Sequence, residues 1–170
     1  MSLDSNCLTF LLEALEGIAK PTDALADQKI ALVRLFFHGA PLLTTPTVRS
    51  EAEQISDPAR KAKHQSWMMT HFGTVPIRVL ANQIARRAMH FWQWHRKPKD
   101  CTVLAEAEAA QFAILLSYDD RFVRRLAGKA NVQLMKPLAY WESLKIPKGS
   151  KPRWVPDQPN PLVTQNWWHW

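Results

Sequence analysis

Short apolar segments alternate with longer segments of helical periodicity along most of the chain. The apolar segments that predict strands are 1–3, 41–45, 75–79, 113–117 and 131–135. The segments that predict helices are roughly 8–18, 21–39, 45–55, 80–92, 103–111, 121–127 and 137–144. This alternation predicts an α/β fold, which we expect to be a three-layer α/β/α sandwich with a central, mainly parallel sheet.

Local signals mark where several of these helices begin and end. Thr22 is placed to cap the second helix, which we expect to stop near Gly39. Pro46 suits the first turn of the next helix, and Glu51 is expected early on that helix. Asp100 stands where an N-cap belongs, ahead of an Ala-rich segment.

The helix expected at 80–92 has an apolar stripe with four-residue spacing, formed by Leu80, Ile84, Ala88 and Trp92. We therefore expect Trp92 in the core beside Phe91, which leaves Trp94 as the tryptophan that faces solvent. Interleaved aromatic and basic residues can also stack unpaired bases, but core packing is the favoured interpretation. His90 and His95 show no metal-ligand spacing and are expected on the surface.

The composition changes at Lys145. From there to the C-terminus the chain has five prolines and four of its eight tryptophans. We expect one globular domain at 1–144, followed by an irregular Pro/Trp-rich tail at 145–170. Exposed tryptophans would form an adhesive apolar patch, so the final NWWHW is expected to pack against its own domain or a second copy.

Composition also narrows the class of protein. The formal net charge of +7 favours a polyanionic partner such as nucleic acid. Asp4 precedes the apolar run near the N-terminus and Glu13 and Glu16 lie within it, unlike a secretory signal. No segment is apolar for long enough to span a bilayer. Cys7 and Cys101 form no C-x-x-C motif, so we expect both to be small buried residues. A cytoplasmic protein without a membrane partner is the prediction.

Four carboxylates occupy places that suit catalysis. Asp4 and Asp119 follow predicted strands, Glu51 lies on the helix after another strand, and Asp100 stands at a helix start. Each acid taken singly is more often structural, but parallel strands would direct all four toward one edge of the sheet, where ligands bind. Converging carboxylates repel one another, and Mg²⁺ or Mn²⁺ offsets this repulsion. Such a site can deliver a metal-activated water to a phosphodiester.

The segments around these acids resemble the PIN-domain nucleases. They read LDSNCLTFLL, TTPTVRSEAEQI, DCTVLAEAEA and LLSYDDRF. The first is similar to the family's opening Leu-Asp-Thr-Asn, and the second to its strand-turn-helix with an internal Glu. The third has an aliphatic residue three positions after Asp and alanines five and seven positions after it. The last is similar to Leu-x-Thr-x-Asp-x-x-Phe, and the resemblance extends from about Leu3 to Leu144.

The resemblance implies a Mg²⁺- or Mn²⁺-dependent endoribonuclease, similar to the VapC toxins, with the catalytic residues Asp4, Glu51, Asp100 and Asp119. The three aspartates would bind the metal, and Asn6 and Ser117 would support it. Many members of the family are toxins that a small antitoxin protein neutralises, and many form homodimers. RNA, an antitoxin and a second copy are therefore the implied partners.

Two features depart from the family pattern. The first strand has three residues before Asp4, fewer than is usual. The interval from Asp100 to Asp119 is one residue longer than is common, so Asp119 or Asp120 could take the last position. The Ser-x-Asp match and Phe122 favour Asp119, which leaves Asp120 as an exposed acid at a helix start or as a supporting group.

Basic residues are segregated in the middle of the chain. No acidic residue lies between Asp57 and Asp100, while nine basic residues do. Such a segment suits nonspecific contacts with phosphate groups. Arg96, Lys97 and Lys99 adjoin Asp100 and are the candidate RNA-binding residues, although a solvated basic face or an antitoxin-binding face would explain them equally well.

Two other functions are compatible with the α/β pattern. A non-catalytic module that binds RNA or protein would keep the fold and the basic surface, but the four acids argue against it. A phosphoacceptor receiver domain needs an acidic pair after the first strand, where only Asp4 is present.

Overall fold

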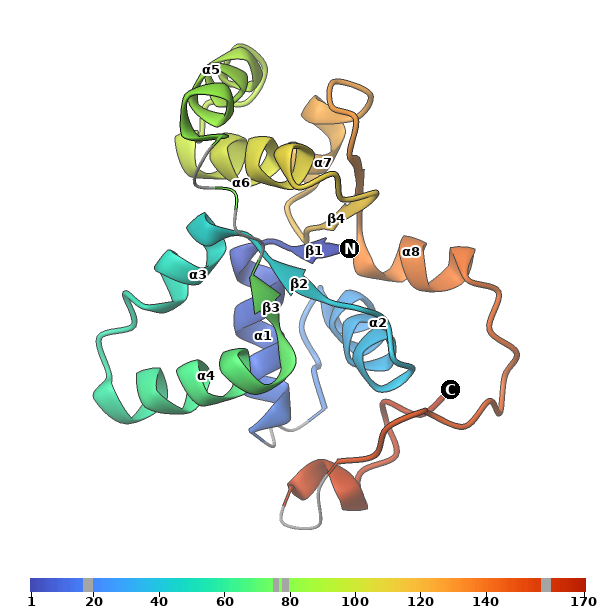
Figure 1. The fold of residues 1–170 in the computed structure, drawn as a ribbon. Helices are drawn as coiled ribbons and strands as arrows, with labels where there is room; N and C mark the ends of the chain where they lie inside the picture. Colours follow the sequence, from blue (N-terminus) through green and yellow to red (C-terminus); the bar gives the residue numbers. More distant parts are fainter. Residues whose placement is uncertain (17–19, 75–76, 78–79, 157–159) are drawn as a thin grey trace.

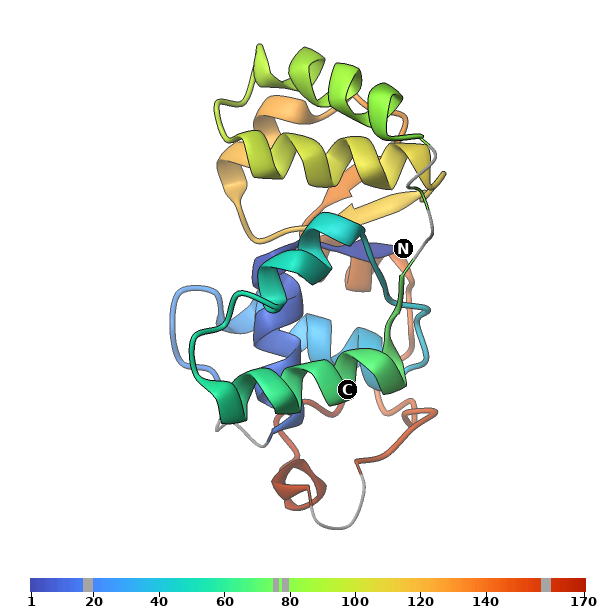
Figure 2. The same cartoon turned by 60° about the vertical axis from the view of Figure 1, so that its left-hand side comes forward.

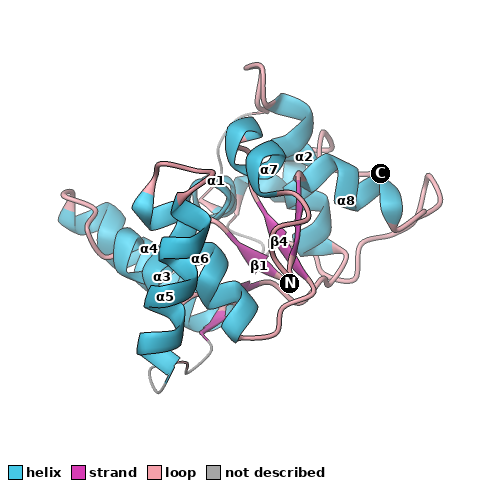
Figure 3. Cartoon of the chain, turned by 90° about the horizontal axis from the view of Figure 1, so that it is seen from above, coloured by secondary structure: helices cyan, strands magenta, loops and turns pink. Residues whose placement is uncertain are grey.

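The computed structural model describes residues 1–16, 20–74, 77, 80–156 and 160–170. Its strands are β1 (Ser2–Leu3), β2 (Leu43–Thr44), β3 (Gly73–Thr74), β4 (Ile114–Leu116) and β5 (Gln133–Met135). Its helices are α1 (Ser5–Leu15), α2 (Ala26–Phe37), α3 (Pro46–Ala52), α4 (Pro58–His71), α5 (Ala81–Trp92), α6 (Pro98–Ala109), α7 (Asp120–Leu126) and α8 (Pro137–Ser143), with a 3-10 turn η2 (Pro161–Thr164). The strand pairs are parallel, and helices lie on both sides of the strands (Figures 1 and 3), which confirms the α/β class.

The order of the strands creates a switch point in the middle of the sheet. The order is β3-β2-β1-β4-β5, so the chain first adds strands on one side of β1 and then returns to build on the other side. Leu3 of β1 pairs with Leu116 of β4. In open parallel sheets of this kind, ligands bind beyond the carboxyl ends of the strands where the order reverses. The residues that follow Leu3 and Leu116 therefore lie at the expected ligand site.

The core surrounds the two central strands. Leu3, Leu115 and Leu116 are fully buried. The long apolar side chains that belong to the same core include Leu8, Leu11, Leu12, Leu32, Leu35 and Leu104, from α1, α2 and α6. Cys7 and Cys101 are also buried, as predicted. Of the described helices, none is both long enough and apolar enough to cross a membrane.

Several predicted helix boundaries are wrong. Thr22 caps no helix, because α2 begins at Ala26 and the Asp23 side chain instead accepts a hydrogen bond from the backbone of Leu25. Gly39 does end α2, with a φ of 79° that glycine adopts without strain. Glu51 lies in the last turn of α3 rather than early on it, because α3 is a short helix.

Two further predictions concern α6 and the segment 75–79. Asp100 is not an N-cap: α6 begins at Pro98, and Lys97 occupies the N-cap position without a capping hydrogen bond from its side chain, so Asp100 lies in the first turn. Proline at the first helical position explains the earlier start. The strand predicted at 75–79 lies largely outside the described residues, and β3 ends just before it.

The burial of Trp92 and Trp94, near the end of α5, is the reverse of the prediction. Phe91 is buried as expected, but Trp92 is 45% exposed, and Trp94 is the tryptophan that packs against the core. Residues spaced by four drift around a helix that has 3.6 residues per turn, so the end of a four-residue stripe leaves the face on which it began. Figure 2 shows α5 and α6 side by side at one end of the molecule.

The C-terminal tail packs on α2. Trp168 is 2% exposed, and its ring lies 4.4 Å from the ring of Phe37. The Arg34 guanidinium donates hydrogen bonds to the backbone oxygens of Trp168 and His169, at 3.1 and 2.9 Å. Among the described tail residues, η2 is the only regular element. The tail therefore covers a surface of the domain at the end opposite to α5 (Figure 1).

Candidate metal centre

Asp4 lies directly after β1, at the switch point of the sheet. Its backbone N–H donates to the oxygen of Leu116 at 3.0 Å, which joins the ends of β1 and β4. Its side chain caps α1, because Oδ1 accepts the Cys7 N–H at 2.8 Å, while Oδ2 accepts a hydrogen bond from Ser117. Burial raises the pKa of Asp4, the hydrogen bonds partly oppose this, and the nearby Asp100 charge adds to it. A buried carboxylate in this position is stabilised by a cation.

Asp119 lies beyond β4 and caps α7. Its Oδ1 accepts the backbone N–H groups of Arg121 and Phe122, at 2.8 and 3.0 Å. Burial raises the pKa of Asp119, but a hydrogen bond from Lys97 and the two backbone donors outweigh it and lower the pKa to about 2. Its own N–H donates to Ser117 Oγ at 3.1 Å. Ser117 therefore bridges Asp4 and Asp119 through two hydrogen bonds.

Asp100 meets a histidine that the sequence placed on the surface. His95 is 2% exposed, and its Nε2 lies 2.7 Å from Asp100 Oδ2. The prediction for His95 is wrong because the turn after α5 folds inward, where the Cys101 thiol donates to the His95 oxygen at 3.1 Å. His90 is exposed, as predicted. One ligand atom from each of His95, Asp100 and Asp119 lies within 4.8 Å of the others, and we call this group the His95 cluster.

The His95 cluster adjoins a cavity of about 220 Å³. Three of the four predicted acids line this cavity, which we call the acidic pocket: Asp4, Glu51 and Asp100. Ser5 and the exposed Asn6 also line it, and Ser5 donates a hydrogen bond to Glu51. Asp119 is not part of the lining. Asp100 thus belongs to both groups, so the four acids form one continuous site with two parts.

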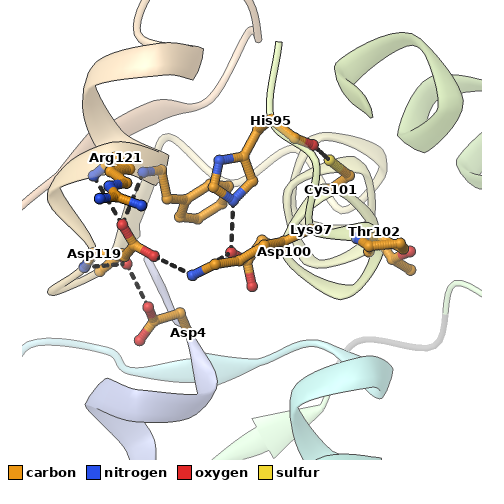
Figure 4. A network of polar contacts seen from close by, with 11 residues as sticks. Asp4, His95, Lys97, Asp100, Cys101, Thr102, Asp119 and Arg121 are labelled. Carbon is orange, nitrogen blue, oxygen red and sulfur yellow. Dashed lines mark hydrogen bonds and ion pairs between the residues drawn. The ribbon is translucent and has the colours of Figure 1, made fainter. Parts of the chain in front are cut away.

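Two lysines pair with three of the four acids. The Lys97 ammonium lies 2.5 Å from Asp119 Oδ2 and 3.7 Å from Asp100 Oδ2, between the two carboxylates (Figure 4). Lys99 Nζ lies 3.0 Å from Glu51 Oε1. The hydrogen bond to Asp119 is the main cause that raises the pKa of Lys97. A position between Asp100 and Asp119 therefore favours a positive charge.

The choice between the adjacent aspartates has a clear structural basis. Asp120 begins α7 as predicted, and its side chain is 71% exposed. Its Oδ1 pairs with Lys136 at 2.5 Å instead of joining the His95 cluster. Asp119 rather than Asp120 is thus the acid that approaches Asp100.

Arg96 differs from its two lysine neighbours. Its guanidinium lies over the Trp92 ring, 4.2 Å from the ring centroid. Of the three predicted RNA-binding residues, Lys97 and Lys99 pair with the acids, and Arg96 packs on an exposed aromatic ring. Lys97 and Lys99 therefore lie beside the acids, and we call this pair the basic wall.

The donor atoms suit a divalent cation. The His95 cluster offers carboxylate oxygens from Asp100 and Asp119, which Mg²⁺ and Mn²⁺ prefer, and a His95 nitrogen, which is compatible with Mn²⁺; Asp4 lies outside this cluster. The ammonium held between Asp100 and Asp119 indicates that a positive charge is favoured there. Neither the models of known protein families nor the curated proteins give a match to this chain.

Proposed function

We propose that this protein is a divalent-metal-dependent endoribonuclease that hydrolyses RNA phosphodiester bonds, as its resemblance to the PIN-domain nucleases implies. The observation that carries the proposal is the meeting of four acids from distant segments at the switch point of a parallel sheet: Asp4, Glu51, Asp100 and Asp119. Asp100 links these acids, because it belongs both to the His95 cluster and to the lining of the acidic pocket.

The side chains have distinct roles in this proposal. Asp4, Asp100 and Asp119 would hold Mg²⁺ or Mn²⁺, which when bound would supply an activated water and offset the charge of the phosphate. Ser117 fixes the Asp4 carboxylate by its hydrogen bond. Glu51 lines the acidic pocket with a carboxylate that can accept the proton of a water molecule.

The basic wall suits an RNA substrate. A pocket of carboxylates repels a phosphate backbone, and positive groups beside it reduce this repulsion. Lys97 and Lys99 carry such groups within 4 Å of the acids, and both side chains are more than half exposed. An RNA backbone that approaches the acidic pocket would therefore meet two ammonium groups at the edge of the pocket.

A second candidate function is a non-catalytic module that binds RNA or protein. The ion pairs of Lys97 with Asp119 and of Lys99 with Glu51 favour it, because they balance two of the four acids without a metal ion. In that case the acids would have a structural role, and divalent ions would not change the behaviour of the protein.

RNA cleavage separates these functions. The full chain should cleave an end-labelled single-stranded RNA with MgCl₂ or MnCl₂ and should be inactive with EDTA. Asp119→Asn and Asp100→Asn should lower the rate at least about 100-fold, because each removes a proposed metal ligand. Glu142→Gln, an exposed acid near the end of α8, is the matched control and should keep the rate. RNA binding without cleavage in both metals would support the binding module instead.

A further inference from the structure

Lys97 holds its ammonium in the place where a cation is favoured, although its side chain is 58% exposed. The residue precedes the first turn of α6 in an extended conformation, so its long stem reaches the acids from outside the core. Its Nζ contacts Asp119 Oδ2 at 2.5 Å and Asp100 Oδ2 at 3.7 Å. An exposed, flexible stem with a bound tip can leave the site without a rearrangement of the fold.

The ammonium and a divalent ion would compete for the same oxygens. Asp100 and Asp119 are two of the three members of the His95 cluster, and both face Lys97 Nζ (Figure 4). A divalent ion bound to these oxygens would lie within a few ångströms of Nζ, where two positive charges repel strongly. Binding of the metal ion therefore requires Lys97 to move away.

A displaced ammonium on this exposed stem can pair with another anion beside the site. Its neighbours Lys99 and Arg96 are cations, so they add positive charge there and attract such an anion. A backbone phosphate that enters the acidic pocket is an anion within reach of the freed side chain. Lysine suits this role because its ammonium is a compact point charge on a stem with free rotation.

We propose that Lys97 is a tethered cation that occupies the metal position in the metal-free protein, is displaced by a divalent ion, and then binds a phosphate group of the nucleic acid. This inference rests on the proposed function, because it assigns Lys97 a positioning role at that site. It predicts that metal and nucleic acid bind cooperatively, since the metal frees the group that holds the phosphate.

Two binding measurements on the full chain test the proposal. In the first, Mn²⁺ affinity is measured by calorimetry for the wild type, Lys97→Met and Lys151→Met, the last being an exposed lysine of the tail. Lys97→Met should bind Mn²⁺ about tenfold more tightly, because the competing cation is gone. Lys151→Met should match the wild type. Equal Mn²⁺ affinity in all three proteins would overturn the proposal.

In the second measurement, the affinity for a single-stranded 2′-O-methyl oligonucleotide is followed by fluorescence anisotropy with and without MnCl₂. Mn²⁺ should increase the affinity of the wild type, and this increase should be at least threefold smaller in Lys97→Met. Lys97→Arg, which keeps the charge, should restore most of it. An equal increase in wild type and Lys97→Met would refute the role in phosphate binding.

The outcomes also separate this inference from the proposed ribonuclease function. RNA cleavage with unchanged Mn²⁺ affinity in Lys97→Met would leave the ribonuclease proposal standing and reject the exchange. Tighter Mn²⁺ binding by Lys97→Met without cleavage of any RNA would support the displacement of Lys97 and reject the ribonuclease proposal.

Discussion

Asp119→Asn isolates the charge of one proposed metal ligand while it keeps the shape of the side chain. The amide oxygen of asparagine can still accept the N–H groups of Arg121 and Phe122, so the cap of α7 is retained. The ion pair with Lys97 is lost. The variant therefore measures what the ionised carboxylate contributes to stability in the absence of metal.

The size of the effect follows from the pKa of Asp119. This pKa is lowered from 3.8 to about 2. At about 1.4 kcal/mol per pH unit, the ionised form contributes at most about 2.5 kcal/mol to the free energy of unfolding at neutral pH. Because the side chain is 21% exposed and asparagine keeps the cap, we expect a loss of about 1–1.5 kcal/mol. For a chain of this size, that corresponds to a Tm lower by about 3–5 °C.

The pH dependence gives the sharper test. A carboxyl group with a lowered pKa stabilises the folded state fully above about pH 4, and this contribution disappears as the pH falls toward about 2. Urea denaturation at pH 7, 5 and 3 should therefore show the same difference between wild type and Asp119→Asn at the first two values, and about half of it at pH 3. Glu142→Gln should show no such change. A difference that stays constant down to pH 3 would refute the assignment to the ionised carboxylate.

Two further variants test the buried acid and the tail. Asp4→Asn should raise the Tm at neutral pH in calorimetry, because the raised pKa of Asp4 means that its ionised form opposes folding at that pH. The same variant should abolish metal-dependent cleavage, and a lower Tm would contradict the reasoning on stability. Trp168→Ala should cost about 3–5 kcal/mol in urea denaturation, because it empties a buried site against Phe37. Trp154→Ala, at a 55% exposed position, should cost less than about 0.5 kcal/mol, and equal losses would refute the packing role of Trp168.

The sequence alone predicted the parallel α/β fold, because the hydrophobic periodicities of strands and helices differ. This difference stays recognisable even when the boundary of an element is misplaced by a few residues. It also singled out the acids near the switch point, since Asp4 and Asp119 directly follow strands whose apolar residues are easy to recognise. Boundaries were predicted less well. Thr22 and Asp100 look like caps by residue type, but the actual starts at Ala26 and Pro98 depend on packing and on proline geometry.

Only the tertiary structure decided which groups surround the acids. His95 carries no spacing signal, and its burial follows from the turn that joins α5 to α6. The exposure of Trp92 has a different origin, because the helical period alone moves the end of a four-residue stripe off the packed face. The pairing of Lys97 with Asp119 joins residues 22 positions apart, and no local pattern encodes such a contact. Local chemistry thus determined which residue types are present at the sheet edge, while the distances and charges between them arose only when the strands were assembled.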